Sequence, residues 1–205
     1  MYRTIRALAI PIILNGLTGC VSIGEVNAGM ARIDRAWQLE YQQTEDEFRY
    51  RVVEADYELV LRAIRQTFLD LGMPIQQSSA VQGIVTVENV APTPLTTEEW
   101  REVVRIEGPK TKEVGGWFMK LQEDPKDYIV TIRATVRPIV GGTLVLLEYQ
   151  LDNPIFRSMG VQPSKHAPPL AVRLSTRKIW SQLEKRLSEV RAPLPRRRQG
   201  WETIA

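Results

Sequence analysis

Two long segments of alternating apolar and polar residues, joined by a glycine pair, constrain the fold of this 205-residue chain more than any other feature. Apolar side chains recur at every second position across residues 128–136 and again across residues 145–151. A period of two places these side chains on one face of a β-strand. Gly141 and Gly142 lie between the segments and can adopt the positive φ angles of a tight turn. The sequence therefore predicts an antiparallel hairpin at the centre of a sheet.

A further strand is predicted at residues 48–53, where apolar and charged side chains also alternate. Phe48, Tyr50 and Val52 point to one face, and Arg49 and Arg51 point to the other. A strand with this pattern has one face in the core and one face in water. We therefore expect the arginines to lie on the wet face.

Residues 56–90 predict a helix followed by two strands. Asp56 is a typical N-cap residue, and the apolar residues after it recur at helical spacing. Gly72 is expected to end the helix, because glycine adopts the left-handed conformation at a helix C-terminus at little cost. Short strands are expected at residues 73–77 and 84–90.

A long C-terminal helix is predicted to begin at the proline pair 168–169 and to end before Pro193, because proline suits a first helical turn and cannot continue a helix. Its apolar stripe consists of Val172, Thr176, Ile179, Leu183, Leu187 and Val190. An antiparallel sheet with helices on one face is the simplest layered arrangement of these elements. The predicted fold class is α+β, with a single domain at 48–192, an insertion at 91–127 and a basic tail at 193–205.

A family resemblance is carried by the helix and strands of residues 55–87. The residues concerned are Asp56-Tyr57, then Val60, Ile64 and Phe68 of the helix, Leu71-Gly72-Met73-Pro74-Ile75 after it, and Gly83-Ile84-Val85-Thr86-Val87. This pattern resembles repeats of the BamC-type (NlpB/DapX) lipoproteins of the outer-membrane β-barrel assembly machinery. The resemblance implies a helix-grip-like fold, in which a curved sheet cups a long helix, and a role in envelope assembly. The chain departs from that family because only one such domain fits its length and because 91–127 is inserted.

The N-terminus predicts a signal peptide at residues 1–19 that ends in a lipidation site. Arg3 and Arg6 precede a short apolar run, which is typical of a secretory signal and too short to span a bilayer. The following Leu17-Thr18-Gly19-Cys20 resembles the lipobox of bacterial lipoproteins. That resemblance implies cleavage before Cys20 and attachment of a diacylglyceryl group and a further acyl chain such as palmitate. The competing interpretation is a free buried thiol in an apolar N-terminal helix.

Loss of this segment would change the charge of the chain. It removes two arginines and no acidic residue, so the formal net charge falls from +3 to +1. A nucleic-acid-binding protein would keep a concentrated basic face, so we expect no nucleic-acid partner. Val21 stands where an aspartate would resemble an inner-membrane retention signal. In a Gram-negative bacterium these features predict a lipid-anchored protein on the periplasmic face of the outer membrane.

Residues 20–47 are predicted to form a tether that contains an amphipathic helix. Its apolar stripe consists of Val26, Met30, Ile33, Trp37 and Tyr41. Spacings of three and four residues place these side chains on one helical face. The helix either packs on its own domain or docks in a groove of a partner protein. We assign the stripe as a candidate partner-binding surface.

The insertion predicts a short helix with an acidic first turn. Thr96 and Glu99 have the spacing of a capping box, and the helix is expected to continue to about Ile106. Glu98, Glu99 and Glu102 have the chemistry of metal ligands or acid–base groups. Acidic residues in the first turn are also what the helix dipole favours, so a solvated helix is the preferred interpretation.

The run Gly115-Gly116-Trp117-Phe118-Met119 follows this helix. Three large apolar residues after a glycine pair indicate either a strand that enters the core or an exposed hydrophobic lip. We assign Trp117, Phe118 and Met119 as further candidate partner contacts.

The sequence contains no recognisable catalytic, metal or cofactor motif. Its single histidine, His166, lies in a proline-rich loop with no orienting partner near it in the sequence, and its single cysteine is assigned to the lipid. We therefore predict a non-enzymatic domain without metal or cofactor that binds a protein partner in the envelope. Two alternatives remain open. One is a carrier or sensor of a small apolar ligand in a helix-grip cavity, and the other is a hydrolase whose carboxylates are brought together by folding.

Overall fold

The computed structural model describes residues 21–161 and 166–191, and within them the fold class is α+β as predicted. Five antiparallel strands form one sheet in the order β1-β5-β4-β3-β2. The strands are β1 (Tyr50–Val53), β2 (Ile75–Ser79), β3 (Ile84–Val90), β4 (Ile129–Ile139) and β5 (Gly142–Asp152). The helices are α1 (Ile23–Phe48), α2 (Tyr57–Asp70), α3 (Thr97–Gly115), α4 (Pro154–Ser158) and α5 (Pro169–Arg191).

The hairpin of β4 and β5 lies at the centre of the sheet, as the alternating pattern predicts. Val136 lies opposite Val145, and Ile132 lies opposite Tyr149. Gly141 makes the turn with a φ angle of 85°. The inward side chains of β4 are fully buried, because the helices cover that face of the sheet.

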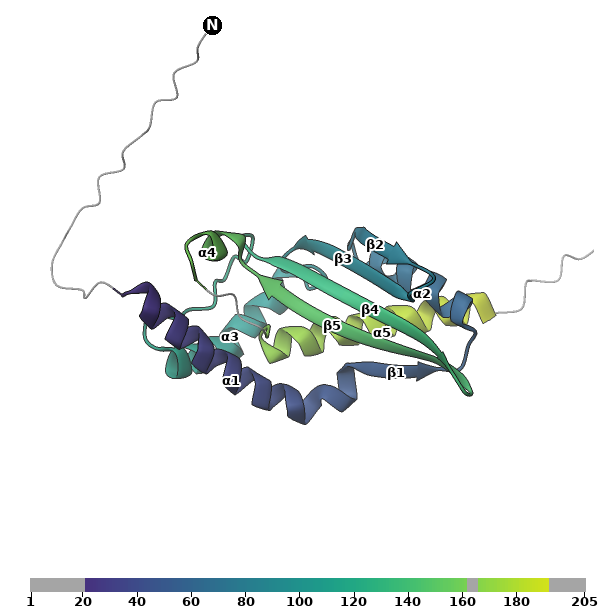
Figure 1. Cartoon of the computed structure of the whole chain (residues 1–205), viewed down its shortest axis with the longest axis horizontal. Helices are drawn as coiled ribbons and strands as arrows, with labels where there is room; N and C mark the ends of the chain where they lie inside the picture. Colours follow the sequence, from purple (N-terminus) through teal and green to yellow (C-terminus); the bar gives the residue numbers. More distant parts are fainter. Residues whose placement is uncertain (1–20, 162–165, 192–205) are drawn as a thin grey trace, which may run out of the picture.

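Helices α2, α3 and α5 lie on one side of the sheet, behind it in the view of Figure 1. Helix α5 packs against α2 and α3, and its buried stripe includes Ile179, Trp180 and Leu183. This arrangement confirms the predicted α+β fold, in which helices that include a long C-terminal helix pack on one face of an antiparallel sheet. Only Val190, the last member of the predicted stripe, differs, because its side chain is exposed.

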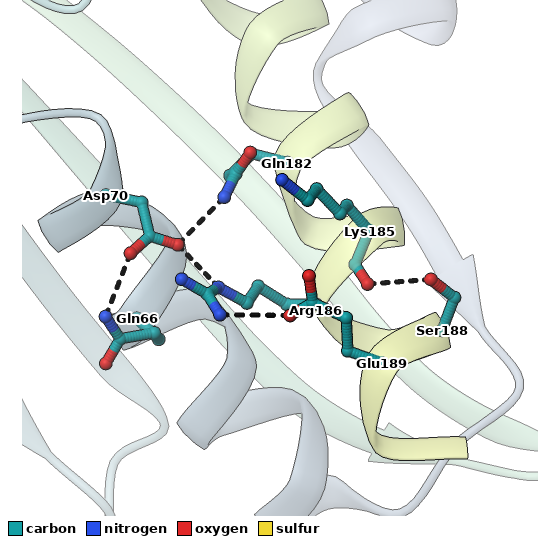
Figure 2. Close-up of polar contacts among 7 residues, drawn as sticks. All are labelled: Gln66, Asp70, Gln182, Lys185, Arg186, Ser188 and Glu189. Atoms are coloured by element: carbon teal, nitrogen blue, oxygen red, sulfur yellow. Dashed lines mark hydrogen bonds and ion pairs between the residues drawn. The ribbon is translucent and has the colours of Figure 1, made fainter. Parts of the chain in front are cut away.

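A polar cluster joins α2 to α5, as Figure 2 shows. The Asp70 carboxylate accepts hydrogen bonds from Gln66 Nε2 at 2.9 Å, from Gln182 Nε2 at 2.8 Å and from Arg186 Nε at 2.5 Å. Arg186 also contacts Glu189 on its own helix at 3.0 Å. These bonds hold the pKa of Asp70 well below its usual range, chiefly because the carboxylate accepts from Arg186. The cluster therefore fixes the second half of α5 against α2.

The two faces of strand β1 are the reverse of those predicted. Arg51 pairs with Val145 of β5, and this register turns its side chain toward the helices. There its guanidinium lies 5.2 Å from the centre of the Trp180 ring and forms an ion pair with Glu184. Tyr50 and Val52 consequently face solvent on the opposite side of the sheet. The alternation correctly predicts a strand, but pairing with β5 decides which side becomes wet.

Helix α3 begins as predicted and continues beyond its expected end. Thr96 Oγ1 accepts a hydrogen bond from the Glu99 backbone, and Glu99 Oε2 accepts one from the Thr96 backbone, which completes the capping box. The helix continues past Pro109 to Gly115, whereas the sequence predicts an end near Ile106. Tertiary contacts of its last turns with α1 stabilise this extension against the helix-breaking effect of proline.

Cys20, the signal segment 1–19 and the basic tail from residue 193 onward lie outside the described residues. Across the part of the chain that is described, none of the helices combines the length and the apolar character that a membrane span requires.

Candidate functional site

Helix α1 occupies most of the segment 20–47 that the sequence assigns to a tether, and it packs on the rest of the described chain. Ser22 and Glu25 form a capping box at its start, with the Glu25 backbone donating to Ser22 Oγ at 3.2 Å and the Ser22 backbone donating to Glu25 Oε2 at 2.7 Å. The helix then packs against α3, α5 and β1. The S-x-x-E spacing in the sequence is the signal that could have predicted this helix start.

The contact between α1 and α3 depends on two glycines and one arginine. A β-carbon on Gly29 would lie 2.6 Å from the carbonyl oxygen of Gly115, so Gly29 permits a close approach of the two backbones. A β-carbon on Gly115 would lie 2.6 Å from Cδ1 of Ile33 on α1, so Gly115 leaves room for that side chain. Arg32 donates from Nε to the carbonyl of Val114 at 2.9 Å and from its terminal nitrogen to that of Gly115 at 2.6 Å. These carbonyls belong to the last turn of α3 and lack partners within the helix. Arg32 therefore caps α3 from a neighbouring helix.

The predicted stripe of α1 faces its own domain along most of its length. Ile33 is 2% exposed and Trp37 is 7% exposed, and they form a small core with Leu121. The side chains of Ile33 and Trp37, which the sequence suggests as candidate partner contacts, are therefore covered by their own domain. Tyr41 is half-buried, and its hydroxyl donates to the Ala167 carbonyl at 3.1 Å.

The run after α3 forms an exposed lip rather than a strand. Gly116 ends the helix with a φ of 119°, which favours glycine, and its N–H donates to the Lys112 carbonyl at 3.0 Å. Trp117 is 67% exposed and meets the Phe118 ring edge-to-face at a centroid distance of 5.9 Å. Phe118 and Met119 turn inward and are half-buried.

An apolar cavity of about 390 Å³ lies between α1, this lip and the segment that follows β5. Six of the eight residues predicted to bind a partner line it, namely Val26, Met30, Ile33, Trp37, Phe118 and Met119. The opposite wall includes Leu151, Met159 and Val161. Its size and apolar wall are typical of sites for small apolar ligands, which occupy roughly 300–1,000 Å³. We define this space as the α1 cavity.

The rim of the α1 cavity is also apolar. Ile23 is 55% exposed and Met159 is 60% exposed, and both line the cavity. Trp117, whose ring contacts Phe118 of the cavity wall, is a further exposed apolar side chain. The start of α1 lies at the left of Figure 1. Val21, which follows Cys20 in the chain, lines the same cavity. The candidate binding surface and the predicted anchor therefore adjoin.

A second cavity of about 370 Å³ lies between α1, β5 and the start of α5 and has a more polar wall. Tyr41, Tyr149, Arg173 and His166 line it. Burial raises the pKa of both tyrosine hydroxyls well above their usual range, so both remain neutral across the physiological range. This cavity is the one that lies beside the sheet and the long helix.

His166 has an orienting partner that the sequence did not reveal. Its backbone N–H donates to Asp34 Oδ1 at 3.2 Å, and its Nδ1 lies 3.6 Å from the same oxygen. The imidazole ring also lies 5.4 Å from the Tyr41 ring. Because Asp34 is 132 residues away on α1, no local pattern indicates this pair. The contacts hold His166, shortly before α5, against α1.

Glu107 is a buried carboxyl group that sequence analysis also missed. It is 1% exposed, and its Oε1 accepts a hydrogen bond from the Leu170 backbone at 3.0 Å. Leu170 lies in the first turn of α5, where backbone N–H groups lack partners within the helix. Burial raises the pKa of Glu107, and nearby Glu40 contributes in the same direction. Glu107 thus links α3 to the start of α5.

The three carboxylates considered as chemical groups have separate structural partners. Glu99 binds Lys178 of α5 at 2.5 Å in addition to completing the capping box. Glu102 binds Arg105, and Glu98 lies 3.9 Å from Arg101. Among the described residues, no group of three or more potential His, Cys, Asp or Glu ligands is arranged to hold a metal ion. These contacts favour the solvated-helix interpretation.

Comparison of the chain with protein-family models and with curated protein sequences gives no match.

Proposed function

We propose that this chain is a non-enzymatic lipoprotein of the bacterial envelope that acts by binding a protein partner. In this proposal a lipid on Cys20 anchors the domain to the periplasmic face of the outer membrane. The binding surface is the apolar end formed by the start of α1, Trp117 and Met159. A role accessory to envelope assembly, by analogy with the BamC-type lipoproteins, is the most specific version of the proposal.

The exposure of Trp117 carries the binding part of this proposal. A tryptophan that is 67% exposed leaves a large apolar ring in contact with water, and its ring contacts Phe118, which lines the α1 cavity together with exposed Ile23 and Met159. Exposed apolar surface of this kind is typical of sites that contact a protein or a membrane. Aromatic residues are also enriched among those that contribute most to binding. Anchoring at position 20 would keep this surface close to other envelope proteins.

Site-specific photocrosslinking can test the proposed surface in intact envelopes. A photoreactive amino acid at Trp117 is expected to give one discrete crosslinked product. The matched control is Val140, which is fully exposed at the β4–β5 turn, at the opposite end of the molecule in Figure 1. Equal crosslinking from both positions, or no product from position 117, would contradict the proposed surface.

A second candidate function, carriage of a small apolar ligand, is supported by the α1 cavity. The cavity is partly enclosed, and its wall is mainly apolar. It lies beneath α1 rather than beneath the long helix where the helix-grip resemblance implies it. The two functions differ in what occupies the site. Partner binding places a protein side chain at the rim of the cavity, whereas ligand carriage places a small molecule inside it.

A further inference from the structure

We propose that the α1 cavity is an acyl-chain site whose occupant is one of the acyl chains carried by Cys20. The other chains of the same lipid remain in the bilayer. This inference rests on the proposed lipidation of Cys20, and it assigns that lipid a second contact, with the domain itself.

Covalent geometry brings the lipid to the cavity. Val21 lines the cavity, and successive Cα atoms in a chain are about 3.8 Å apart. An acyl chain on residue 20 therefore starts within one residue of the cavity wall. A tethered group of this kind has a high effective concentration at the site. A free ligand would need an equally high bulk concentration to occupy the site to the same extent.

The wall has the chemistry that an acyl chain requires. Met30, Met119 and Met159 all line the cavity, and their flexible thioether side chains adapt to the shape of a bound group. Ile33 and Trp37 form its buried floor, and Phe118 forms part of the lip. An apolar chain would replace empty space with dispersion contacts along these side chains.

The proposed arrangement also agrees with the number of acyl chains that a lipidated Cys20 would carry. Two acyl chains are sufficient for stable membrane anchoring, so a third chain is free to occupy a protein site. Moving that chain from the bilayer to the cavity exchanges one apolar environment for another.

The single cysteine allows a direct test with the mature chain from Cys20 to Ala205, which retains every described residue. N-dodecylmaleimide attaches one twelve-carbon chain at Cys20, and N-ethylmaleimide gives a matched product without it. Methyl NMR of labelled methionines then compares Met30, Met119 and Met159 with Met73. Met73 is fully buried in the main core and does not line the cavity, so its signal is the internal reference.

The dodecyl product is expected to remain monomeric and to show shifted signals for the three cavity methionines, with Met73 unchanged. Met30→Trp fills the cavity and is expected to cause self-association of the dodecyl product. Leu39→Trp, on the exposed face of α1, is the matched control and should behave as the unsubstituted chain. If Met30→Trp perturbs the Met73 signal, Val26→Phe replaces it.

Two results would overturn the proposal. In the first, the dodecyl product self-associates while the cavity methionines keep their positions, which shows that the attached chain does not enter. In the second, free dodecanoate shifts these signals in the ethyl product while the attached chain does not, which identifies a free fatty acid as the occupant. A native protein without acyl groups on Cys20, detected by mass spectrometry, would contradict the proposed lipidation and is distinct from both results.

Discussion

The backbone of Gly29 in α1 touches that of Gly115 in α3, where a β-carbon on Gly29 would stand 2.6 Å from the Gly115 carbonyl oxygen. The contact joins two segments that are far apart in the sequence and brings the start of α1 against the lip after α3. The α1 cavity exists because these two helices meet at this point.

Gly29→Ala is expected to destabilise the domain by about 2 kcal/mol, which is typical of overpacking against a backbone atom that cannot move aside. Gly24→Ala is the matched control in the same helix, because its added β-carbon would meet only Ser22 Oγ, at 3.8 Å. Urea unfolding of both variants provides the measurement. Equal stability of the two variants would show that the Gly29 contact is not tight.

Trp37 and Trp117 are expected to respond differently to truncation. Trp37→Ala removes a buried side chain and is expected to cost about 3 kcal/mol, whereas Trp117→Ala removes an exposed one and should change stability little. In crosslinking experiments we expect the product from position 117 and not from position 37, because of these two tryptophans only Trp117 is available to a partner. Thermal unfolding of both variants checks the first expectation, and a stable Trp37→Ala protein would return the α1 stripe to the candidate partner contacts.

The raised pKa of Glu107 predicts that the domain becomes less stable as the pH rises. Its folded pKa is raised above the value in the unfolded chain, so the folded state holds its proton more tightly. The contribution of this group to the free energy of unfolding is therefore highest at low pH. It falls as the pH rises from the pKa in the unfolded chain through the pKa in the folded chain. Glu107→Gln keeps an acceptor for the Leu170 N–H, and it should be more stable than the native chain at pH 8 but not at pH 4.

Denaturant titrations across this pH range measure the difference, with Glu113→Gln as the control on the exposed face of the same helix. Parallel stability profiles for the native chain and Glu107→Gln would mean that the buried carboxyl group does not titrate as inferred.

Asp70 predicts the opposite pH dependence. Its folded pKa is lowered, so its contribution to stability is present above the unfolded pKa and is lost as the pH falls toward the folded one. Asp70→Asn is expected to cost about 1 kcal/mol at pH 7, which is typical of an ion pair near the surface, and less in acid. A double-mutant cycle with Arg186→Gln measures the coupling. A coupling energy of zero at pH 7 would remove this cluster as a link between α2 and α5.

The elements with regular local patterns could be predicted from the sequence. The β4–β5 hairpin follows from its period of two, and the start of α3 follows from the capping box of Thr96 and Glu99. Each of these signals lies within a few residues, and the tertiary structure does not oppose it.

The features that were missed depend on contacts between distant residues. The side of the sheet that Arg51 occupies is decided by its pairing with Val145, and the partner of His166 is Asp34 on another element. The α1 stripe correctly predicts an apolar face, but its spacing is the same whether that face covers a cavity or meets a partner. Only the approach of α1 to α3 distinguishes the two.

Membrane attachment through Cys20 is the central claim, and acyl labelling combined with envelope fractionation tests it most directly. The full chain is expected to incorporate a labelled palmitate analogue and to sediment with the outer membrane. Cys20→Ser should lose the label and move to the soluble periplasmic fraction, whereas Ala31→Ser, an exposed substitution in α1, should behave as the native chain. Unchanged labelling or unchanged membrane partition of Cys20→Ser would contradict the account.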